Sequence, residues 1–171
     1  MNNNYLRART LARTRHAGQQ YGTYPYSYHL DAVADLATPF GTEAMIVAQL
    51  HDLIEDTDSS IDEIAADFGF TIADAVLYLT DTPFGERTQR KQEANARLKS
   101  LTVFEESGRL ALIVKACDRL ANVRASKQLD PQRLQRYRDE HLEFRRACYR
   151  QGLCEAVWWE LDNLIEKVGS E

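Results

Sequence analysis

Apolar residues recur at every third or fourth position through nearly the whole chain, which is the spacing of one face of an α-helix. No segment shows the strict alternation typical of a half-buried strand, and no internal repeat, low-complexity tract or interdomain linker interrupts the pattern. The sequence therefore predicts one all-α domain over residues 1–171. The clearest apolar stripe lies between residues 110 and 123 and consists of Leu112, Ile113, Ala116, Leu120 and Val123.

Residues that start or stop helices divide this pattern into segments. Thr42, Ser60 and Thr71 are positioned to cap helix N-termini, and Asp130 followed by Pro131 predicts a cap with proline in the first turn. The predicted helices cover residues 5–19, 29–37, 44–57, 60–69, 71–80, 86–104, 109–126, 132–150 and 154–168, with loops over 20–28 and 81–85.

Composition narrows the class of protein. The 171 residues are 44% hydrophobic and 27% charged, which suits one soluble globular domain. No apolar run reaches the roughly 20 residues that cross a bilayer, and the polar start lacks the apolar core of a secretory signal, so we expect a cytoplasmic protein. The net charge of −5 gives no general attraction to DNA, RNA or an anionic membrane. The three cysteines form no Cys-x-x-Cys pair and are expected to be reduced core thiols: Cys117, Cys148 and Cys154.

The predicted helix over 44–57 carries an unusual group of polar residues. His51 lies one turn before Glu55, and Asp52 one turn before Asp56, so all four side chains share one face if the helix is continuous. Such an acidic cluster needs a compensating cation, and adjacent His and Asp residues are able to chelate a metal ion. The alternative is a solvated acidic helix end with a surface histidine.

A second carboxylate, Asp118, interrupts a helix that is otherwise expected to be buried. Burying an unpaired carboxylate is costly, so Asp118 needs either a positively charged side chain or a metal ion as its partner. Lys115 and Arg119 are the nearest candidates for an ordinary salt bridge. The residues by themselves leave both possibilities open.

Five pieces of the chain, in order, carry a family resemblance. They are HAGQ at 16–19, PYSYH at 25–29, HDLIEDT at 51–57, LTD at 79–81 and VKACDRLAN at 114–122. Together they resemble the HD phosphohydrolase superfamily and, more narrowly, the hydrolase domain of Rel/SpoT proteins and of stand-alone small alarmone hydrolases. The motif-bearing core spans about residues 8–124, and C-terminal helices are expected over 131–168.

The resemblance implies a single HD-domain bundle of about ten helices that binds one metal ion. The ligands it implies are His29, His51, Asp52 and Asp118, with Mn²⁺ as the usual ion. Mixed imidazole and carboxylate ligands suit Mn²⁺ without excluding Fe, Co or Zn.

The implied reaction is removal of pyrophosphate from the 3′ position of a guanosine tetra- or pentaphosphate. By the resemblance, Glu55 and Asp56 orient the attacking water or move a proton. Asn122 matches a family asparagine that contacts the nucleotide. Lys91 resembles a basic position that faces phosphates, and Arg133 and Tyr137 lie on a helix that is able to approach the nucleotide. For each of these the alternative is a solvated helix face.

The chain departs from the family pattern after the first piece. Where guanosine-specific hydrolases usually have Arg-Lys, this sequence has Gln20-Tyr21 followed by Gly22. Tyr21 or Tyr24 is expected to stack on the base instead, and stacking tolerates any purine. The substrate that the resemblance implies is therefore ppGpp, ppApp or a related nucleotide, with the base left open. A different phosphatase activity, such as removal of the 2′-phosphate of NADPH, and a silent alarmone-binding module are the alternatives, and the oligomeric state stays open.

Overall fold

The computed structural model describes residues 3–81 and 84–166. In this part the chain forms ten α-helices, one 3₁₀ helix and a hairpin of two short strands, which confirms the all-α prediction. The elements are α1 (Asn3–Arg15), β1 (Gln20–Tyr21), β2 (Tyr24–Pro25), α2 (Ser27–Ala37), η1 (Thr38–Phe40), α3 (Thr42–Leu50), α4 (Leu53–Asp56), α5 (Ile61–Phe68), α6 (Phe70–Leu79), α7 (Arg87–Ser100), α8 (Glu106–Leu129), α9 (Pro131–Cys148) and α10 (Glu155–Glu166).

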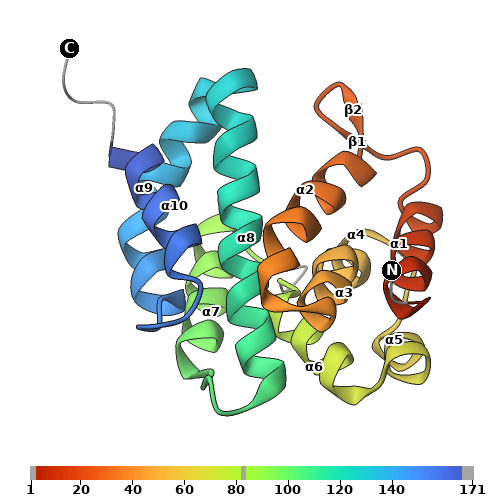
Figure 1. The fold of residues 1–171 in the computed structure, drawn as a ribbon. Helices are drawn as coiled ribbons and strands as arrows, with labels where there is room; N and C mark the ends of the chain where they lie inside the picture. Colours follow the sequence, from red (N-terminus) through yellow and green to blue (C-terminus); the bar gives the residue numbers. More distant parts are fainter. Residues whose placement is uncertain (1–2, 82–83, 167–171) are drawn as a thin grey trace.

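Helix α8 runs through the centre of the bundle (Figure 1). Its 24 residues span about 36 Å at the usual rise of an α-helix. It contacts α2, α3 and α6 on one side and α9 and α10 on the other. The apolar stripe predicted for this helix is completely buried, and so are most other positions between Leu110 and Val123. A helix covered from several sides has no solvated face, so a polar residue on it must find a partner inside the protein.

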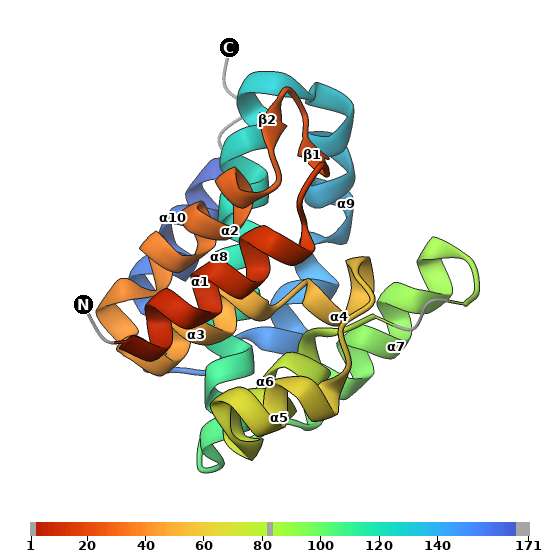
Figure 2. The same ribbon diagram turned by 90° about the vertical axis from the view of Figure 1, so that its right-hand side faces the viewer.

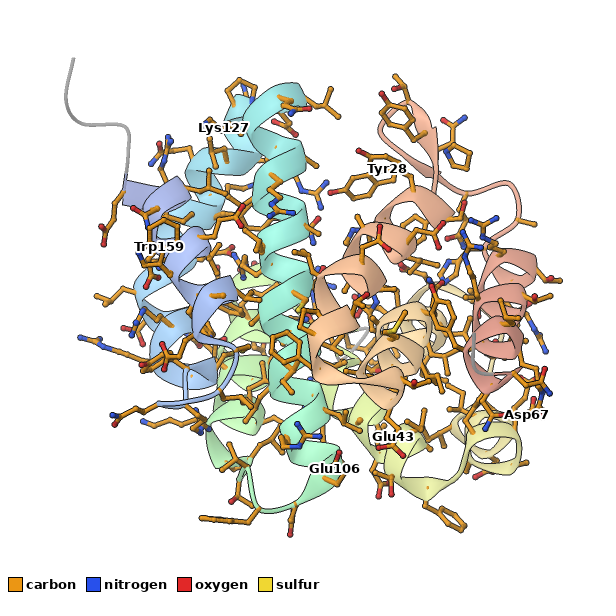
Figure 3. The ribbon with its side chains drawn as sticks, in the orientation of Figure 1. Tyr28, Glu43, Asp67, Glu106, Lys127 and Trp159 are labelled. Carbon is orange, nitrogen blue, oxygen red and sulfur yellow. The ribbon has the colours of Figure 1, made fainter. Side chains whose placement is uncertain are left out.

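The remaining helices form two groups on either side of α8 (Figures 1 and 2). In one group, α3 packs against α1, α2 and α6, and α5 packs against α6. In the other, α9 packs against α7, α8 and α10. Phe144 and Trp158 join α9 to α10, with ring centroids 5.6 Å apart. Trp159, the next residue along, is 70% exposed and projects from the outer face of α10 (Figure 3).

The predicted helix over 44–57 is broken, which corrects the sequence-based expectation. Helix α3 ends at Leu50 with His51 as its C-cap, and α4 begins at Leu53. Asp52, between them, has φ −99° and ψ 1°, which is outside the helical region. The apolar spacing carries no signal of this break because Leu53 remains buried. The break places His51 and Asp52 at a junction, so the assumption of one continuous polar face was wrong.

Several other boundaries also differ from the prediction. The first helix ends at Arg15 instead of residue 19, and the tyrosine-rich loop contains the β1–β2 hairpin, in which Tyr21 pairs with Tyr24. The hairpin strands have two residues each, which is too short for strand periodicity to be visible. Helix α2 begins at Ser27, two residues before the predicted start at His29.

The predicted caps are partly confirmed. The hydroxyl of Ser60 accepts a hydrogen bond from the Glu63 backbone N–H. The carboxylate of Asp130, which directly precedes Pro131, accepts one from the backbone N–H of Arg133. The predicted caps Thr42 and Thr71 are wrong, because α3 and α6 are preceded by glycines as their N-caps. Both glycines have positive φ, which only glycine adopts without strain.

Two further expectations concern the chain as a whole. Cys117, Cys148 and Cys154 are buried free thiols, as predicted. Among the helices of the described residues, none combines the length and the apolar character needed to span a membrane. The expected loop over 81–85 and the end of the last predicted helix lie partly outside the described residues.

Candidate active site

A polar cavity of about 360 Å³ opens where the hairpin meets α2, α4, α7, α8 and α9. Among the described residues, five acidic and five basic side chains line it, together with polar and aromatic groups. The acidic residues are Asp52, Glu55, Asp56, Asp81 and Asp118, and the basic ones are Arg87, Lys91, Lys115, Arg119 and Arg133.

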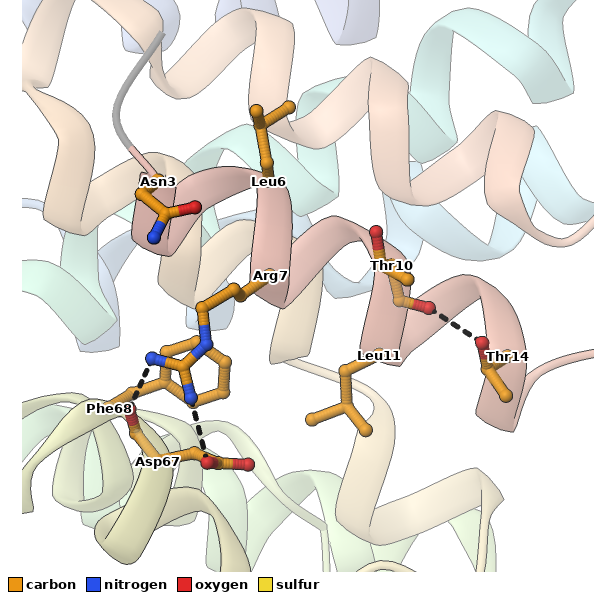
Figure 4. A pocket seen from close by; sticks show the side chains of 8 residues that line it. All are labelled: Asn3, Leu6, Arg7, Thr10, Leu11, Thr14, Asp67 and Phe68. Carbon is orange, nitrogen blue, oxygen red and sulfur yellow. Dashed lines mark hydrogen bonds and ion pairs between the residues drawn. The ribbon is translucent and has the colours of Figure 1, made fainter.

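A larger hollow of about 540 Å³ lies elsewhere, between α1 and α5 (Figure 4). Leu6, Leu11 and Phe68 supply much of its wall. The charged groups on it, Arg7 and Asp67, are satisfied by each other over 2.9 Å. It therefore presents no group prepared for chemistry, and the polar cavity is the candidate active site.

His29, His51 and Asp118 converge at the floor of the polar cavity. One potential ligand atom from each lies within 4.8 Å of the others. His29 Nε2 is 3.3 Å from Asp118 Oδ1, and His51 Nε2 is 3.8 Å from the same oxygen. The carboxylate of Asp52 adjoins this group, since its Oδ2 is 3.1 Å from His51 Nε2 and 3.7 Å from His29 Nε2. The structure thus brings together all four side chains that the family resemblance implies as ligands.

The orientation of His51 fits a metal ion in this position. Its Nδ1 lies 2.7 Å from the Ala48 carbonyl oxygen, which can only accept, so Nδ1 carries a proton. The buried Nε2 has no hydrogen-bond partner among the described residues and faces two carboxylates. A lone pair and two negative charges repel one another unless a cation lies between them. Burial lowers the pKa of His51, but Asp52 and Asp118 more than reverse this, so that the site favours a positive charge. Two imidazole nitrogens and two carboxylates are also a suitable donor set for a divalent transition metal.

Tyr21 and Asn122 hold two of these side chains in place. The Tyr21 ring stacks on the imidazole of His29, with centroids 4.8 Å apart and planes 12° from parallel. Its hydroxyl donates to Asn122 Oδ1 over 2.8 Å, and Asn122 Nδ2 donates to Asp118 Oδ1 over 2.5 Å. Burial raises the pKa of Tyr21 to about 12, so the hydroxyl stays protonated. Such hydrogen bonds from outside the ligand set fix the orientation of metal ligands.

Tyr26 is a site residue that the sequence reasoning did not identify. Its hydroxyl lies 2.6 Å from Asp52 Oδ2 and 3.1 Å from Asp56 Oδ2. Burial and the charge of Asp52 raise the pKa of Tyr26, so the group acts as a donor. Its ring stacks on His16, whose Nδ1 is 2.8 Å from Gln19 Oε1. Tyr26 belongs to the PYSYH piece, but nothing in the sequence distinguishes it from the neighbouring tyrosines.

Glu55 lies in the cavity wall, beside the ligand cluster. Its Oε2 accepts a hydrogen bond from the backbone N–H of Asp81 over 3.1 Å. Burial raises the pKa of Glu55, and the Asp81 N–H offsets part of this rise. Burial and the charge of Asp52 raise the pKa of Asp56 as well. A carboxylate with a raised pKa is better suited to accept a proton near neutral pH.

Lys115 is a second site residue that was not identified as such. Its Nζ is 3.7 Å from Asp118 Oδ2, so the salt bridge considered as an alternative for Asp118 is present together with the histidine contacts. Burial lowers the pKa of Lys115, but Asp118 and Asp81 raise it above its usual value. Lys91 pairs with Asp81 over 2.6 Å. Both lysines line the cavity as cations held by carboxylates.

Arg133 and Tyr137 reach the cavity from α9, as the sequence led us to expect. Arg133 donates to Asn122 Oδ1 over 2.8 Å and to the Tyr137 hydroxyl over 2.9 Å. Tyr24, by contrast, does not line the cavity. Tyr24 is 45% exposed at the hairpin, and its ring stacks on Tyr28, with centroids 4.6 Å apart. The geometry therefore does not support a role for Tyr24 in base stacking.

Comparison with known protein families agrees with this geometry. The model of the HD domain matches residues 8–144, which is most of the chain. The chain belongs to the HD-domain family. Every residue that lines the polar cavity falls within the matched range of this HD domain.

Curated relatives include a Synechocystis protein named as a probable guanosine-3′,5′-bis(diphosphate) 3′-pyrophosphohydrolase, which is 35% identical over 94% of this chain and 22% of its own length. A Haemophilus influenzae protein named as a guanosine-3′,5′-bis(diphosphate) 3′-pyrophosphohydrolase is 32% identical over 78% of this chain and 20% of its own length. A Mycobacterium leprae relative, named as a probable GTP pyrophosphokinase, is 31% identical over 92% of this chain and 20% of its own length. The HD-domain chain thus spans about a fifth of each of these relatives.

The fold also matches a solved structure. That structure is described as a metazoan ortholog of SpoT that hydrolyzes ppGpp, and it superposes with a TM-score of 0.86 at 20% identity, covering 99% of this chain and 97% of the other. A second structure, from Listeria monocytogenes, superposes with a TM-score of 0.64 at 17% identity, covering 88% of this chain and all of the other. These similarities show that the bundle described above is the fold of an HD domain.

Proposed function

We propose that this HD-domain chain is a metal-dependent 3′-pyrophosphohydrolase of alarmone nucleotides, (p)ppGpp or (p)ppApp. The observation that carries the proposal is the His29, His51, Asp52 and Asp118 cluster at the floor of a cavity that also contains basic side chains. The names of the relatives supply the reaction class. The sequence motifs supply the same expectation independently of the fold.

The metal we propose is Mn²⁺, held by His29, His51, Asp52 and Asp118. When bound, a divalent cation offsets phosphate charge and makes water more acidic, which provides hydroxide near neutral pH. Two imidazole nitrogens and two carboxylates are compatible with Mn²⁺, and the same donors also accept Fe, Co or Zn. The free thiols of the chain agree with a reducing cytoplasm as its location.

The side chains of the cavity have separate proposed roles. Glu55 accepts a proton from the attacking water, since its carboxylate faces the cavity and burial raises its pKa. Asp56, beside the Tyr26 hydroxyl, orients water through the same hydrogen-bonded group. Water adds to the phosphorus next to the ribose as the bond to the 3′-oxygen breaks, and that oxygen takes up a proton from solvent. Lys115 lies beside the ligand cluster and stabilises negative charge on the pyrophosphate as it is released.

A smaller hollow offers a place for the base. It has a volume of about 240 Å³, lies between α2 and α8, and shares Tyr21 and His29 with the main cavity. Ala32, Leu36 and Ala121 give it apolar walls suited to a flat ring. Tyr28, Arg124 and Gln128 add polar side chains to its wall. The purine preference stays open, as in the sequence.

Product analysis tests the proposal. Purified protein loaded with Mn²⁺ is incubated separately with ppGpp, ppApp, NADPH and deoxynucleoside triphosphates, and the products are separated by anion-exchange chromatography. Pyrophosphate released together with GDP or ADP is the expected result. Phosphate released from NADPH alone, or nucleotide binding without turnover, contradicts the proposed reaction.

A further inference from the structure

Arg119 lies between two cavities of the molecule. It lines the candidate active site and also a hollow of about 240 Å³ between α7 and α9. Its side chain is only 9% exposed. The guanidinium lies over the rings of Tyr137 and Phe144, at 4.6 Å and 4.3 Å from their centroids. The two rings hold this cation in one position before any ligand arrives, which reduces the entropy cost of binding.

The hydrogen-bonding capacity of Arg119 is mostly unused. Its Nη1 donates to Glu140 Oε2 over 3.2 Å. Within residues 3–81 and 84–166, its Nε and Nη2 have no protein acceptor. A guanidinium this deeply buried is stable only if its remaining N–H groups meet water or an acceptor in the adjoining cavities. An anionic oxygen is the strongest acceptor available to it.

The local charge is also unbalanced. Arg87 pairs with Glu140 Oε1 over 2.8 Å, so the single carboxylate of Glu140 serves two guanidiniums. Lys91 pairs with Asp81 and Lys115 with Asp118, so neither lysine draws on Glu140. The junction of α7, α8 and α9 therefore carries an excess of one positive charge at the edge of the candidate active site.

We propose that Arg87 and Arg119, bridged by Glu140, form an anion subsite that receives the 5′-diphosphate of the substrate. This inference rests on the proposed function, which places the 3′-diphosphate at the His and Asp cluster and leaves the 5′-diphosphate to be bound elsewhere. Guanidinium groups bind phosphate oxygens with two parallel hydrogen bonds and retain their charge at all physiological pH values. The subsite makes the enzyme selective for nucleotides that carry phosphates on both the 3′ and 5′ positions.

Two substrates that differ only in the 5′-diphosphate test this selectivity. Arg87→Gln removes one cation at a position whose side chain is 49% exposed, so the fold is expected to persist. Its matched control is Arg7→Gln, which breaks an ion pair of similar exposure on α1 (Figure 4). For guanosine 3′,5′-bis(diphosphate), KM of Arg87→Gln should rise about tenfold, with kcat within about twofold. For guanosine 3′-diphosphate with a free 5′-hydroxyl, KM should stay unchanged; an equal rise for both nucleotides overturns the proposal.

A second variant should change KM for the bis(diphosphate) in the opposite direction. Glu140→Gln keeps the shape of the side chain but removes the negative charge that Arg87 and Arg119 share. It should lower KM for the bis(diphosphate), whereas Arg87→Gln raises it. A purely structural role for the three residues predicts losses in both variants, and that outcome also overturns the subsite.

Binding of GDP separates the subsite from the reaction. Calorimetric titration of the full chain with GDP and with guanosine needs no turnover. Wild-type protein and Arg7→Gln should bind GDP more tightly than guanosine, and Arg87→Gln should lose about tenfold in GDP affinity. This result, with no hydrolysis of any nucleotide, keeps the subsite and rejects the proposed function. Equal GDP affinity in all three proteins rejects the subsite even if hydrolysis occurs.

Discussion

The hydroxyl of Tyr26 donates a hydrogen bond to Asp52 Oδ2 over 2.6 Å. The Tyr26 hydroxyl oxygen also lies 3.1 Å from Asp56 Oδ2, so one phenol from the start of α2 connects the α3–α4 junction with the end of α4. Asp52 has a backbone conformation outside the helical region, and the phenol fixes the direction of its carboxylate. Tyr26 is thus placed to set the geometry of the candidate metal site.

Replacing Tyr26 by Phe tests this role. The ring can keep its stack on His16, with centroids 4.7 Å apart in the present structure, so the fold should persist. Loss of the hydrogen bond to Asp52 should weaken Mn²⁺ binding by about tenfold or more, the usual effect of removing a group that orients a ligand. Calorimetric titration of the metal-free protein with Mn²⁺ measures this affinity. Unchanged metal affinity in a folded Tyr26→Phe protein contradicts the assignment, and Tyr28→Phe, at an exposed residue of the same segment, is the matched control.

Asp118→Ala should abolish stoichiometric metal binding. The variant removes the carboxylate that lies within 3.8 Å of both candidate histidine ligands. It also leaves the largely covered Lys115 without its partner on α8, so a loss of stability is expected as well. Elemental analysis of the purified protein and circular dichroism separate the two effects. A folded variant that retains one equivalent of metal excludes Asp118 as a ligand.

Glu55→Gln should retain metal and lose most activity. The amide keeps the size of the side chain and can still accept from the Asp81 N–H, but it cannot take a proton from water. We expect kcat to fall by about 100-fold or more, which is typical when a general base is removed. Steady-state assays with metal content measured in parallel test this, and Glu43→Gln on α3, an exposed residue, is the control. Activity within a few-fold of wild type would falsify the assigned role.

The pH dependence of stability should include a contribution from Asp31. Burial by itself raises the pKa of Asp31, but hydrogen bonds from Arg9, Gln49 and Arg13 lower it from 3.8 to about 2. Because the folded-state pKa is depressed, the carboxylate stabilises the protein above about pH 4 and this stability is lost as pH falls towards 2. Allowing for its partial exposure, the contribution is about 1 to 2 kcal/mol.

Asp31→Asn should therefore lower the free energy of unfolding at pH 7 and flatten its decrease between pH 4 and pH 2. Urea denaturation at several pH values measures both changes. Asp67→Asn, at the exposed pair with Arg7, should change stability by less than about 1 kcal/mol. Equal pH profiles for wild type and Asp31→Asn contradict the prediction.

Gly108→Ala should destabilise the start of α8. A Cβ at this position would lie 2.8 Å from the Thr102 carbonyl oxygen, so the backbone before the helix must shift. Alanine favours helix by about 1 kcal/mol over glycine, but we expect overpacking to exceed this and to lower stability by about 1 to 3 kcal/mol. Thermal denaturation measures the difference. Ser107→Ala, one residue earlier in the same turn, should have an effect near zero, and a stabilised Gly108→Ala protein shows that the contact relaxes without cost.

The sequence by itself determined much of the fold. Apolar spacing located nearly all the helices, because burial of one face repeats with the helical period. Ser60 and Asp130 were correctly identified as caps, since this short-range hydrogen bonding depends only on neighbouring residues. The four ligand candidates were also found in the sequence, through motifs whose order along the chain is preserved. Their role as ligands remains a prediction.

Only the tertiary structure decided how these residues meet. His29, His51 and Asp118 lie on elements far apart in the chain, and their convergence depends on how α2, α3 and α8 pack. The break at Asp52 leaves the apolar spacing intact, so periodicity cannot show it. Tyr26 and Arg119 gained their significance from partners 26 and 21 residues away. Contacts of this kind are set by distance in space, whereas a sequence pattern records only distance along the chain.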